Sequence, residues 1–553
     1  MRSLHKAAFL CALLYHPAGY AAPLTPADRD AVQQQQQDLL LQNQQQREEI
    51  QRSLQPRPLA QPSSSEQGPC FTIRQIDIDN TTLLSERSQS RLISPYINQC
   101  LGMEKINKLT RDISDWYISR GYITSRAFLT EQDLSAGTLH IAVLEGTLQA
   151  IRIEGTSSRQ LKMAFPGLEG KILNLRDIEQ GMEQINRLRT TPVQIEILPG
   201  ENAGQSIVNL TATPEFPLSA ALGFDNSGQK STGTGQLTGS LTANNPLGLA
   251  DKWFISGGRS SDFAKDHDAQ SFQAGVSVPW GYSLVDYSYS WSDYLTTLDN
   301  KGYLWHSTGR AETHRLNLSH VLYRNGDLKT AASLGLTHRI SRNYLNDAPL
   351  LSSSRKLTSL QFGLNHTQKI AGGVATLNPS FSRGVPWFGA ENDNGKRGDV
   401  PKAGFRKWSV SASFQRPVTQ KIWWLTSVYG QWSPDRLYGS ERLTIGGESS
   451  VRGFKEQYLS GDNGGYLRNE LSYSLFSLPY LGEVSLIAAV DGGWLRNDND
   501  DRQASGTLWG ASSGISVAGR YYSSQFTVGT PLHYPGDLAP DRLVIYYRLG
   551  LAI

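Results

Sequence analysis

The sequence is poor in cysteine and has no long apolar run. Only three cysteines occur among its 553 residues, at positions 11, 70 and 100. After the first residues, no stretch approaches the roughly 18 apolar residues that a membrane-spanning helix needs. The ten histidines never cluster at metal-ligand spacing, so we expect no metal site. Basic and acidic residues nearly balance, 53 against 50, and a net charge of +3 argues against a nucleic-acid binder.

The start of the chain has the pattern of a secretory signal peptide. Arg2 and Lys6 form a charged region, residues 7–14 form an apolar core, and residues 19–21 form a small-residue cleavage signal. We predict that residues 1–21 are a signal peptide and that the chain is exported. A short buried helix is the alternative.

Export determines the state of the cysteines. Removal of Cys11 with the signal peptide leaves Cys70 and Cys100 in an oxidising compartment. We predict a disulfide between them, which stabilises by about 3–4 kcal/mol in the chain-entropy model. A pair of free structural thiols is the alternative.

The first part of the exported chain is rich in glutamine. Residues 22–54 consist largely of good helix formers, and Thr25 before Pro26 is a typical helix start. The apolar residues are too sparse to bury this helix in an ordinary core. It is therefore either a disordered arm or a helix in a wet, polar cavity. Residues 55–69 follow as a linker rich in Pro and Ser.

An internal repeat of two small mixed α/β units follows, which we assign to residues 70–146 and 147–214. In each unit a strand pattern precedes apolar residues at helical spacing, and two more strand patterns follow. Expected strands are 71–78, 122–129 and 137–146 in the first unit and 148–155, 193–198 and 205–214 in the second. The helical stripes are Ile106, Leu109, Ile113, Trp116 and Tyr117, and then Leu175, Ile178, Met182, Ile185 and Leu188.

Residues 215–553 alternate between apolar and polar side chains throughout. In 285–292, 408–415 and 542–553, apolar side chains share one face of each expected strand. The opposite face is dominated by Ser, Thr, Gln and Asn, and at about 20 residues per strand and connection the segments number about 14–18. An exported chain without a helical span can cross a membrane only as a closed barrel. We predict a mainly β protein in which small α+β domains precede a transmembrane antiparallel β-barrel.

Two segments resemble catalytic motifs only in part. Residues 510–514, GASSG, match the serine-nucleophile pattern, but no helical stripe follows to form the required elbow. We assign them to a strand packed near a bulky group. Residues 389–397, GAENDNGKR, resemble a P-loop but have five spacer residues, Arg in place of Ser or Thr, and no following helix. We therefore expect no catalytic residue, no cofactor and no enzymatic activity.

One late loop interrupts the alternation. Residues 446–457, GGESSVRGFKEQ, are too long and too rich in glycine for a strand, and they contain a lone arginine, Arg452. On spacing alone this is an exposed loop arginine, which would contribute little to stability.

The order of these regions, with VRGF in a late loop, resembles the TpsB outer-membrane transporters of two-partner secretion. The likeness is to the branch of haemolysin activators and contact-dependent-inhibition transporters. It covers the whole mature chain and includes residues 121–146 in the first repeat and 225–253 at the start of the barrel. VRGF alone marks a superfamily that also holds barrel-assembly insertases, but the combination with two repeats and an N-terminal helix is specific.

The resemblance implies that the repeats are POTRA domains in the periplasm and that the barrel has about 16 strands. Residues 22–54 would plug the barrel at rest. The protein would recognise a large unfolded exoprotein, a TpsA partner such as a haemolysin, adhesin or contact-dependent toxin, and export it through the barrel to the cell surface. Cargo would pair with edge strands of residues 71–214 by β-augmentation. Expected partners are this exoprotein and outer-membrane lipid, without nucleic acid, and the protein would be a monomer.

The resemblance also implies a role for the lone arginine. Its loop would fold into the barrel, where the arginine would pair with the aspartate of a D-x-G pattern on a nearby strand. In this chain these residues are Val451, Arg452, Gly453, Phe454, Asp491 and Gly493. A guanidinium suits a carboxylate bidentately, which Lys cannot match. Two positions depart from the family: Ala489 stands where Gly or Phe is frequent, and Ile553 replaces the usual final aromatic residue, which weakens the expected assembly signal.

Three other classes of membrane protein fit the pattern less well. A barrel-assembly insertase, which is the alternative function, would be expected to have more POTRA repeats. A passive porin does not need periplasmic repeats. An autotransporter would carry its cargo in the same chain.

Overall fold

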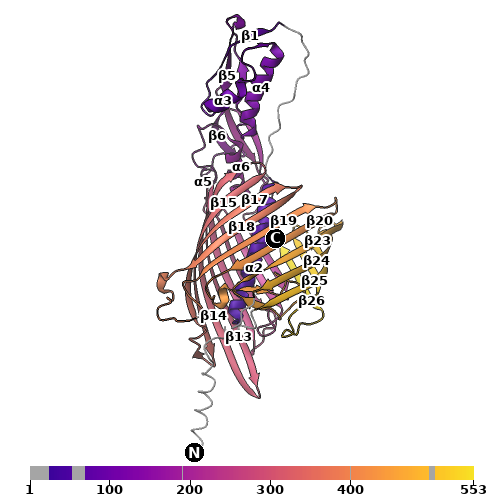
Figure 1. Ribbon diagram of the computed structural model, residues 1–553. Helices are drawn as coiled ribbons and strands as arrows, with labels where there is room; N and C mark the ends of the chain where they lie inside the picture. The colour runs from indigo at the N-terminus through magenta and orange to yellow at the C-terminus, as the bar shows by residue number, and fades with distance from the viewer. Residues whose placement is uncertain (1–23, 53–68, 190, 399, 497–504) are drawn as a thin grey trace, which may run out of the picture.

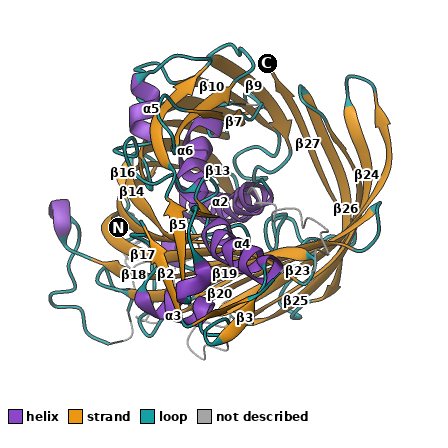
Figure 2. Cartoon of the chain, turned by 90° about the horizontal axis from the view of Figure 1, so that it is seen from above, coloured by secondary structure: helices purple, strands orange, loops and turns teal. Residues whose placement is uncertain are grey.

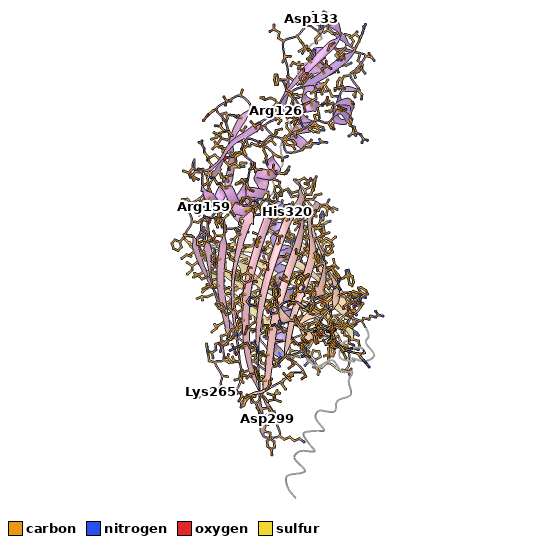
Figure 3. All side chains as sticks on the ribbon, turned by 90° about the vertical axis from the view of Figure 1, so that its left-hand side faces the viewer. Arg126, Asp133, Arg159, Lys265, Asp299 and His320 are labelled. Atoms are coloured by element: carbon orange, nitrogen blue, oxygen red, sulfur yellow. A yellow bond between two sulfur atoms is a disulfide. The ribbon has the colours of Figure 1, made fainter. Side chains whose placement is uncertain are left out.

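The computed structural model describes residues 24–52, 69–189, 191–398, 400–496 and 505–553. The predicted signal peptide and nearly all of the predicted linker lie outside these ranges. In Figure 1 two small α/β units lie in line above a large barrel, and helix α2 (Pro26–Gln51) runs inside it. Figure 3 labels Asp133 at the far end of the first unit and Asp299 at the opposite end of the molecule. Within the described ranges, no helix is both long enough and apolar enough to cross a membrane.

Helix α2 begins where the sequence predicts. Thr25 is the N-cap, and its side chain accepts a hydrogen bond from the backbone N–H of Asp28 at 3.2 Å, while Pro26 opens the helix. Its buried residues are as often polar as apolar: Ala27, Val32, Gln36, Asn43, Arg47 and Ile50. Figure 2, a view along the barrel, shows α2 within the ring of strands. The helix therefore occupies a polar cavity and is not a disordered arm.

The first unit packs a long helix on a three-stranded sheet in the order β2–β5–β4, while β1 pairs with β3. Helix α4 buries four residues of the predicted stripe, and Trp116 packs partly buried against the same core. The elements are β1 (Phe71–Ile73), β2 (Gln75–Asp79), α3 (Glu86–Ile93), β3 (Gln99–Leu101), α4 (Met103–Ser119), β4 (Arg126–Leu129), the short 3-10 helix η1 (Leu134–Ala136) and β5 (Thr138–Leu144).

Two strand predictions in this unit are wrong in extent. The predicted strand 71–78 is two strands, because β1 pairs with β3 whereas β2 pairs with β5. The predicted strand 122–129 begins only at Arg126, because the backbone N–H of Ser125 donates to the carbonyl of Tyr122 in a turn. Helix α3 is not predicted, since it buries none of its side chains and so has no apolar stripe.

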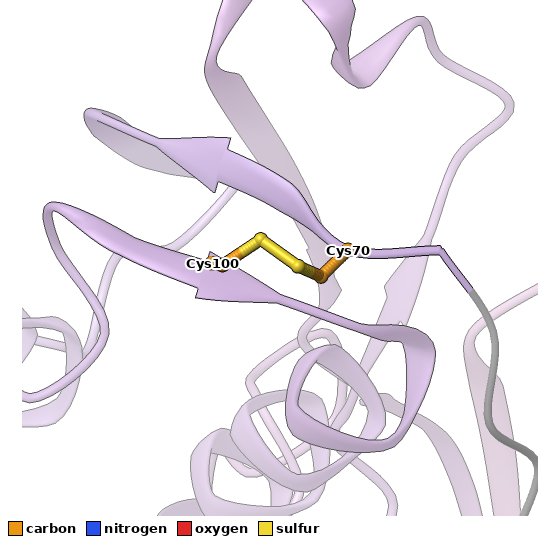
Figure 4. Close-up of a disulfide and its surroundings, with 2 residues drawn as sticks. All are labelled: Cys70 and Cys100. Atoms are coloured by element: carbon orange, nitrogen blue, oxygen red, sulfur yellow. A yellow bond between two sulfur atoms is a disulfide. The ribbon is translucent and has the colours of Figure 1, made fainter.

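The predicted disulfide is formed. Cys70 and Cys100 are bridged, with their Cα atoms 5.3 Å apart. Figure 4 shows the bridge beside the paired strands β1 and β3. It therefore ties the start of the first unit to the strand that leads into α4.

The second unit repeats this plan with a sheet in the order β6–β8–β7. Helix α6 supplies the predicted apolar stripe, and Leu188 lies just beyond its end but is also buried. The elements are β6 (Thr147–Ile153), α5 (Arg159–Ala164), α6 (Leu175–Asn186), β7 (Gln194–Pro199) and β8 (Gln205–Thr211). Figure 1 places α5 and α6 next to the barrel.

Sixteen antiparallel strands close the barrel, as predicted, and the last strand pairs with the first. A two-residue strand, β16 (Ala348–Pro349), extends one loop. The sixteen are β9 (Leu218–Asp225), β10 (Gln236–Asn244), β11 (Lys252–Ser260), β12 (Asp268–Trp280), β13 (Ser283–Asn300), β14 (Tyr303–Arg324), β15 (Leu328–Leu345), β17 (Arg355–Ile370), β18 (Gly373–Gly384), β19 (Arg406–Pro417), β20 (Ile422–Trp432), β23 (Gly464–Leu478), β24 (Gly482–Leu495), β25 (Gly506–Ala518), β26 (Tyr522–His533) and β27 (Val544–Ala552).

The two faces of the barrel wall differ in polarity in the predicted sense. The outward face is apolar and exposed; on the last strand and its flanks it consists of Leu543, Ile545, Tyr547, Leu549, Leu551 and Ile553. Polar side chains face the interior, among them Thr376, Asn378, Ser411 and Ser413, which are buried. An apolar exterior around a polar lumen is the arrangement of a membrane barrel and not of a soluble sandwich.

Candidate functional site

The loop with the lone arginine folds back into the barrel. It lies between two short strands that pair with each other, β21 (Leu443–Ile445) and β22 (Leu459–Gly461). Val451 and Phe454 are fully buried in an apolar cluster on the inner wall, which also contains Ile445, Tyr466 and Leu508. The loop is therefore docked on the wall and is not an exposed excursion.

Arg452 is held by two carboxylates of the wall. Its Nε donates to Asp491 Oδ2 at 2.7 Å and its Nη2 donates to Asp491 Oδ1 at 2.9 Å, which is the bidentate geometry of a guanidinium on a carboxylate. The backbone N–H of Arg452 also donates to Asp491 Oδ2, at 3.0 Å, and Nη1 donates to Glu470 Oε2 at 2.6 Å. The Arg452 and Asp491 side chains are 3% and 1% exposed. A charge pair shielded to this degree becomes strongly destabilising if one partner is removed.

Glycines allow the loop backbone to touch the wall. Gly453 has φ +104, and a Cβ there would lie 2.4 Å from the carbonyl oxygen of Thr530. A Cβ on Gly510 would lie 1.8 Å from the carbonyl oxygen of Arg452, and one on Gly529 would lie 2.9 Å from the backbone nitrogen of Gly453. The loop therefore crosses β25 and β26 at backbone contact, where no other residue type leaves room.

The predicted Gly493 and the unpredicted Tyr546 support the same contact. A Cβ on Gly493 would lie 3.0 Å from Val451 Cγ2, so this glycine leaves space for the loop. The hydroxyl of Tyr546 donates to the carbonyl oxygen of Phe454 at 2.5 Å. The structure thus brings together in one place all six residues that were predicted to form this site.

Nothing in the site points to bond-making chemistry. Residues 510–514 lie within β25, where Gly510 faces the backbone of Arg452, the close neighbour expected for this segment. Residues 389–397 lie in the loop after β18. Among the described residues, no group of three or more His, Cys, Asp or Glu could hold a metal ion. The arrangement can fix a loop by charge pairing and close packing.

Sequence comparison shows the family. A model described as haemolysin secretion/activation protein ShlB/FhaC/HecB matches residues 204–517, more than half of the chain. The chain belongs to the ShlB/FhaC/HecB family. A ShlB-type POTRA domain model matches residues 71–146, and a second POTRA domain model matches residues 147–199.

Similar proteins include members of known name. The outer membrane transporter CdiB of Escherichia coli is 63% identical over 98% of this chain and 93% of that protein. The outer membrane transporter CdiB of Dickeya dadantii is 52% identical over 97% of both chains. A solved structure of CdiB from Escherichia coli matches with a TM-score of 0.93 at 63% identity, covering 96% of this chain and 100% of the other.

In this family member helix α2 contacts both the docked loop and strand β21, which precedes it. Arg29 Nη1 donates to Glu456 Oε2 at 3.1 Å, and Gln36 Nε2 donates to the carbonyl oxygen of Thr444 at 2.6 Å. Leu39 packs against the apolar cluster that holds Val451 and Phe454. Movement of the helix would therefore uncover one side of the loop.

Polar contacts also tie α2 to the barrel wall. Asn43 Oδ1 accepts hydrogen bonds from Thr376 Oγ1 at 2.6 Å and from Asn378 Nδ2 at 3.0 Å. Arg47 donates from Nη1 to Ser413 Oγ at 2.5 Å and from Nε to Gln415 Oε1 at 3.0 Å. Cavities of about 400 and about 500 Å³ lie beside the helix. The helix occupies part of the lumen without packing into an apolar core.

The side chain of Lys329 contacts both helix α2 and the second POTRA domain. Lys329 Nζ, at the periplasmic end of β15, contacts Glu49 Oε2 in the last turn of α2 at 3.0 Å and also pairs with Glu183 of α6. Arg324 of β14 donates to Gln180 Oε1 at 2.6 Å and to Glu183 Oε2 at 3.1 Å. Acidic residues of α2 and of the second POTRA domain therefore form one network of ion pairs with basic residues of the barrel.

Sequence reasoning missed four residues of the loop site, Glu470, Gly510, Gly529 and Tyr546. Glu470 and Tyr546 give no signal of their own, because their reach to Arg452 and Phe454 depends on how the loop docks. Gly510 stands out in the sequence only through its incomplete catalytic motif. Gly529 gives no signal, since glycine in a strand has many roles and the loop that crosses it is about 75 residues away by chain position.

Proposed function

We propose that this protein exports a large exoprotein of the contact-dependent or haemolysin type, its TpsA partner, through the barrel. The protein is an outer-membrane transporter of two-partner secretion, with its POTRA domains in the periplasm. The observation that carries the proposal is a closed barrel whose polar lumen contains a helix held mainly through polar contacts. The helix can leave such a lumen, and an extended exoprotein chain can then take its place.

The contacts of α2 suit reversible plugging. Each hydrogen bond to the wall can be replaced by one to water or to a passing chain, and a typical one contributes only about 0.5–1.5 kcal/mol net. The helix has no broad apolar face that would have to be exposed on release, because half of its buried residues are polar. We propose that the helix leaves the lumen when cargo arrives.

The edge strands of the POTRA sheets are candidates for cargo capture. Strands β2 and β4 form the edges of the first sheet, and β6 and β7 form those of the second. Unpaired backbone groups at an edge can bind an extended segment of the exoprotein, and neighbouring side chains then select its sequence. No nucleotide is required, and folding of the cargo outside would make the movement one-way.

We propose that the Arg452–Asp491 pair keeps the loop on the wall while the chain passes. With the loop docked, residues 446–457 form part of the lumen surface. The barrel-assembly insertase is not favoured, because the family and the relatives are secretion transporters.

Co-expression with a candidate exoprotein tests the function. We expect the exoprotein to appear on the cell surface only when this transporter is present, with assembly of unrelated outer-membrane barrels unchanged by its removal. Surface exoprotein in cells without the transporter would contradict the export function. Impaired assembly of unrelated barrels would support the insertase.

A further inference from the structure

The loop after β18 carries an aromatic turn outside the barrel. Residues 386–389, Pro-Trp-Phe-Gly, here called the aromatic tip, contain the 3-10 helix η2 (Trp387–Gly389). Trp387 and Phe388 are 48% and 62% exposed. Phe388 has φ +58, a conformation that bulky side chains rarely adopt. In Figure 1 this segment is the short orange turn that projects beyond the wall, and in Figure 2 it is the short purple turn outside the ring.

The backbone of the tip is fixed to the outer surface of the wall. Thr358 Oγ1 donates to the carbonyl oxygen of Trp387 at 3.0 Å, and the backbone N–H of Val385 donates to the carbonyl oxygen of Thr358 at 2.8 Å. The ring of Phe388 lies edge-on to that of His338, 5.8 Å between centroids. The two aromatic rings are therefore presented outward from an ordered base.

This base lies on the apolar exterior of the barrel. His338 shares a face of β15 with Leu334, and Thr358 shares a face of β17 with Phe362 and Leu364, because alternate residues of a strand point the same way. These three apolar side chains are 41%, 52% and 45% exposed. The tip is farther from the POTRA domains than they are, so it lies at the extracellular edge of the lipid-facing surface.

Two basic side chains flank the tip. Lys356 Nζ lies 3.1 Å from the position that a Cβ on Gly389 would take. Arg383, on β18, is exposed and pairs in register with Leu360 of β17. Aromatic rings at the depth of lipid headgroups, with cations beside them, form a surface that suits a phosphate-bearing lipid.

We propose that the aromatic tip inserts into the outer leaflet of the membrane and that Lys356 and Arg383, four strand positions apart on the outer face, each bind a lipid phosphate there. The charge and the continuity with the apolar exterior favour a lipid over a protein partner or a second copy of this chain. The inference rests on the outer-membrane placement of the barrel. It adds a specific lipid contact on one loop, which the strand aromatics of the wall do not provide.

A spin label on the tip tests the insertion. We would label the full-length Phe388→Cys variant with a nitroxide, reconstitute it in vesicles of phosphatidylcholine with lipid A, and measure relaxation by oxygen and by a water-soluble nickel chelate. Matched labels at Phe362→Cys and Leu351→Cys report lipid and water; Leu351 is 79% exposed in the loop after β15. We expect the Phe388 label to resemble that at Phe362, with high oxygen and low nickel accessibility. A Phe388 label as accessible to nickel as that at Leu351 would overturn the insertion.

Changes in lipid composition, charge and protein density test the phosphate contact and self-association separately. The added pair Arg383→Gln and Lys356→Gln should shift the Phe388 label towards water in vesicles with lipid A; no shift would overturn phosphate binding. Vesicles without lipid A keep the phosphate of phosphatidylcholine, so a shift towards water there would assign the contact to the phosphates of lipid A, and an equal position would assign it to lipid phosphate in general. Spin–spin broadening that grows with protein density would mean that a second copy covers the tip, which contradicts the proposal. If the Phe362 label is itself in water, the barrel placement has failed, and the proposal fails with it.

Discussion

At the scale of single residues, the lumen loop depends on one guanidinium. Arg452 makes four hydrogen bonds to Asp491 and Glu470, one of them from its backbone, in a place that excludes most water. A bidentate contact fixes both distance and orientation, so it can hold a loop in one pose where a point charge would allow several. The contact therefore selects a conformation as well as stabilising it.

The first prediction concerns the geometry of that contact. Arg452→Lys keeps the positive charge but loses the bidentate contact with Asp491. We therefore expect secretion to fall nearly as far as in Arg452→Ala, while the barrel still inserts and remains heat-modifiable. Removing one partner of a shielded pair costs about 3–5 kcal/mol. Surface exoprotein is the readout for both variants and for Asp491→Ala. Full secretion by Arg452→Ala and Asp491→Ala would contradict the proposed role.

The second prediction concerns the glycine beneath the loop. Gly510→Ala places a Cβ 1.8 Å from the carbonyl oxygen of Arg452, so we expect the loop to lose its docked pose and secretion to fall as in Arg452→Ala. Gly430→Ala is the matched control, because its Cβ would meet Val410 Cγ1 at an ordinary 3.6 Å. Protease sensitivity of the loop in intact cells, together with secretion, measures the effect. Equal behaviour of the two alanine variants would refute this role of Gly510.

A third prediction concerns pH and the first POTRA domain. Glu145 accepts hydrogen bonds from the backbone N–H groups of Thr82 and Leu83, both at 2.9 Å, and from the hydroxyl of Tyr117 at 2.8 Å. Partial burial acts to raise the pKa of Glu145, but the hydrogen bonds outweigh it and hold the pKa below the usual 4.5. Since the folded-state pKa is the lower one, the stabilisation is complete above pH 4.5 and is lost as the pH falls through the folded value.

Amide hydrogen exchange in the full-length protein measures this effect. We expect protection of Thr82 and Leu83 to fall on acidification below the usual glutamate pKa in the wild type. In Glu145→Gln it should be low near neutral pH and should change little with pH. Wild-type protection that is independent of pH would contradict this role of the carboxylate.

At the scale of elements, helix α2 connects parts of the protein that are far apart in sequence. Its first half contacts the docked loop through Arg29 and strand β21 through Gln36, and its last turn shares Lys329 with the second POTRA domain. Cargo that displaces the POTRA domain would weaken the hold on Glu49, and release of the helix would in turn uncover one side of the loop, which its own contacts keep on the wall. The plug is thus placed to transmit cargo binding to the lumen.

A fourth prediction tests the shared lysine. Lys329→Met removes the cation that Glu49 shares with Glu183, while Glu183 keeps Arg324, so we expect the helix to leave more often and ion conductance through single barrels to rise. Deletion of residues 27–54 should give the upper limit of conductance without blocking secretion. Gln44→Ala is the matched control, because Gln44 is exposed and bonds only to Glu48 of the same helix. Unchanged conductance in both Lys329→Met and the deletion would count against plugging.

At the scale of the whole molecule, the sequence predicts most of the architecture because each part has its own periodicity. Alternation identifies the barrel strands, the glutamine-rich run identifies α2, and the stripes from Ile106 and Leu175 identify α4 and α6. Short elements that bury little of their surface, such as α3, leave no apolar periodicity in the sequence. Residues 71–78 divide into two strands because each half pairs with a different strand. The sequence of the segment carries no information about these partners.

The site is predictable only where a motif marks it. VRGF and D-x-G point to Arg452 and Asp491, but the contributions of Glu470, Gly510 and Gly529 arise from how a long loop crosses three strands. Close backbone approach is a property of the assembled wall. For the same reason the aromatic tip and the charges around Lys329 are visible only in the structure.

The central claim is that the exoprotein passes through the space that α2 occupies. Asn43 and Asn378, on the plug and on the wall, are hydrogen-bonded to each other at 3.0 Å, so cysteines at both positions can be joined by a short bifunctional thiol reagent. We expect the joined Asn43→Cys/Asn378→Cys protein to insert normally and export no exoprotein, while each single variant exports as the wild type does. Full export by the joined protein would show that the chain does not use the lumen, and would contradict the claim.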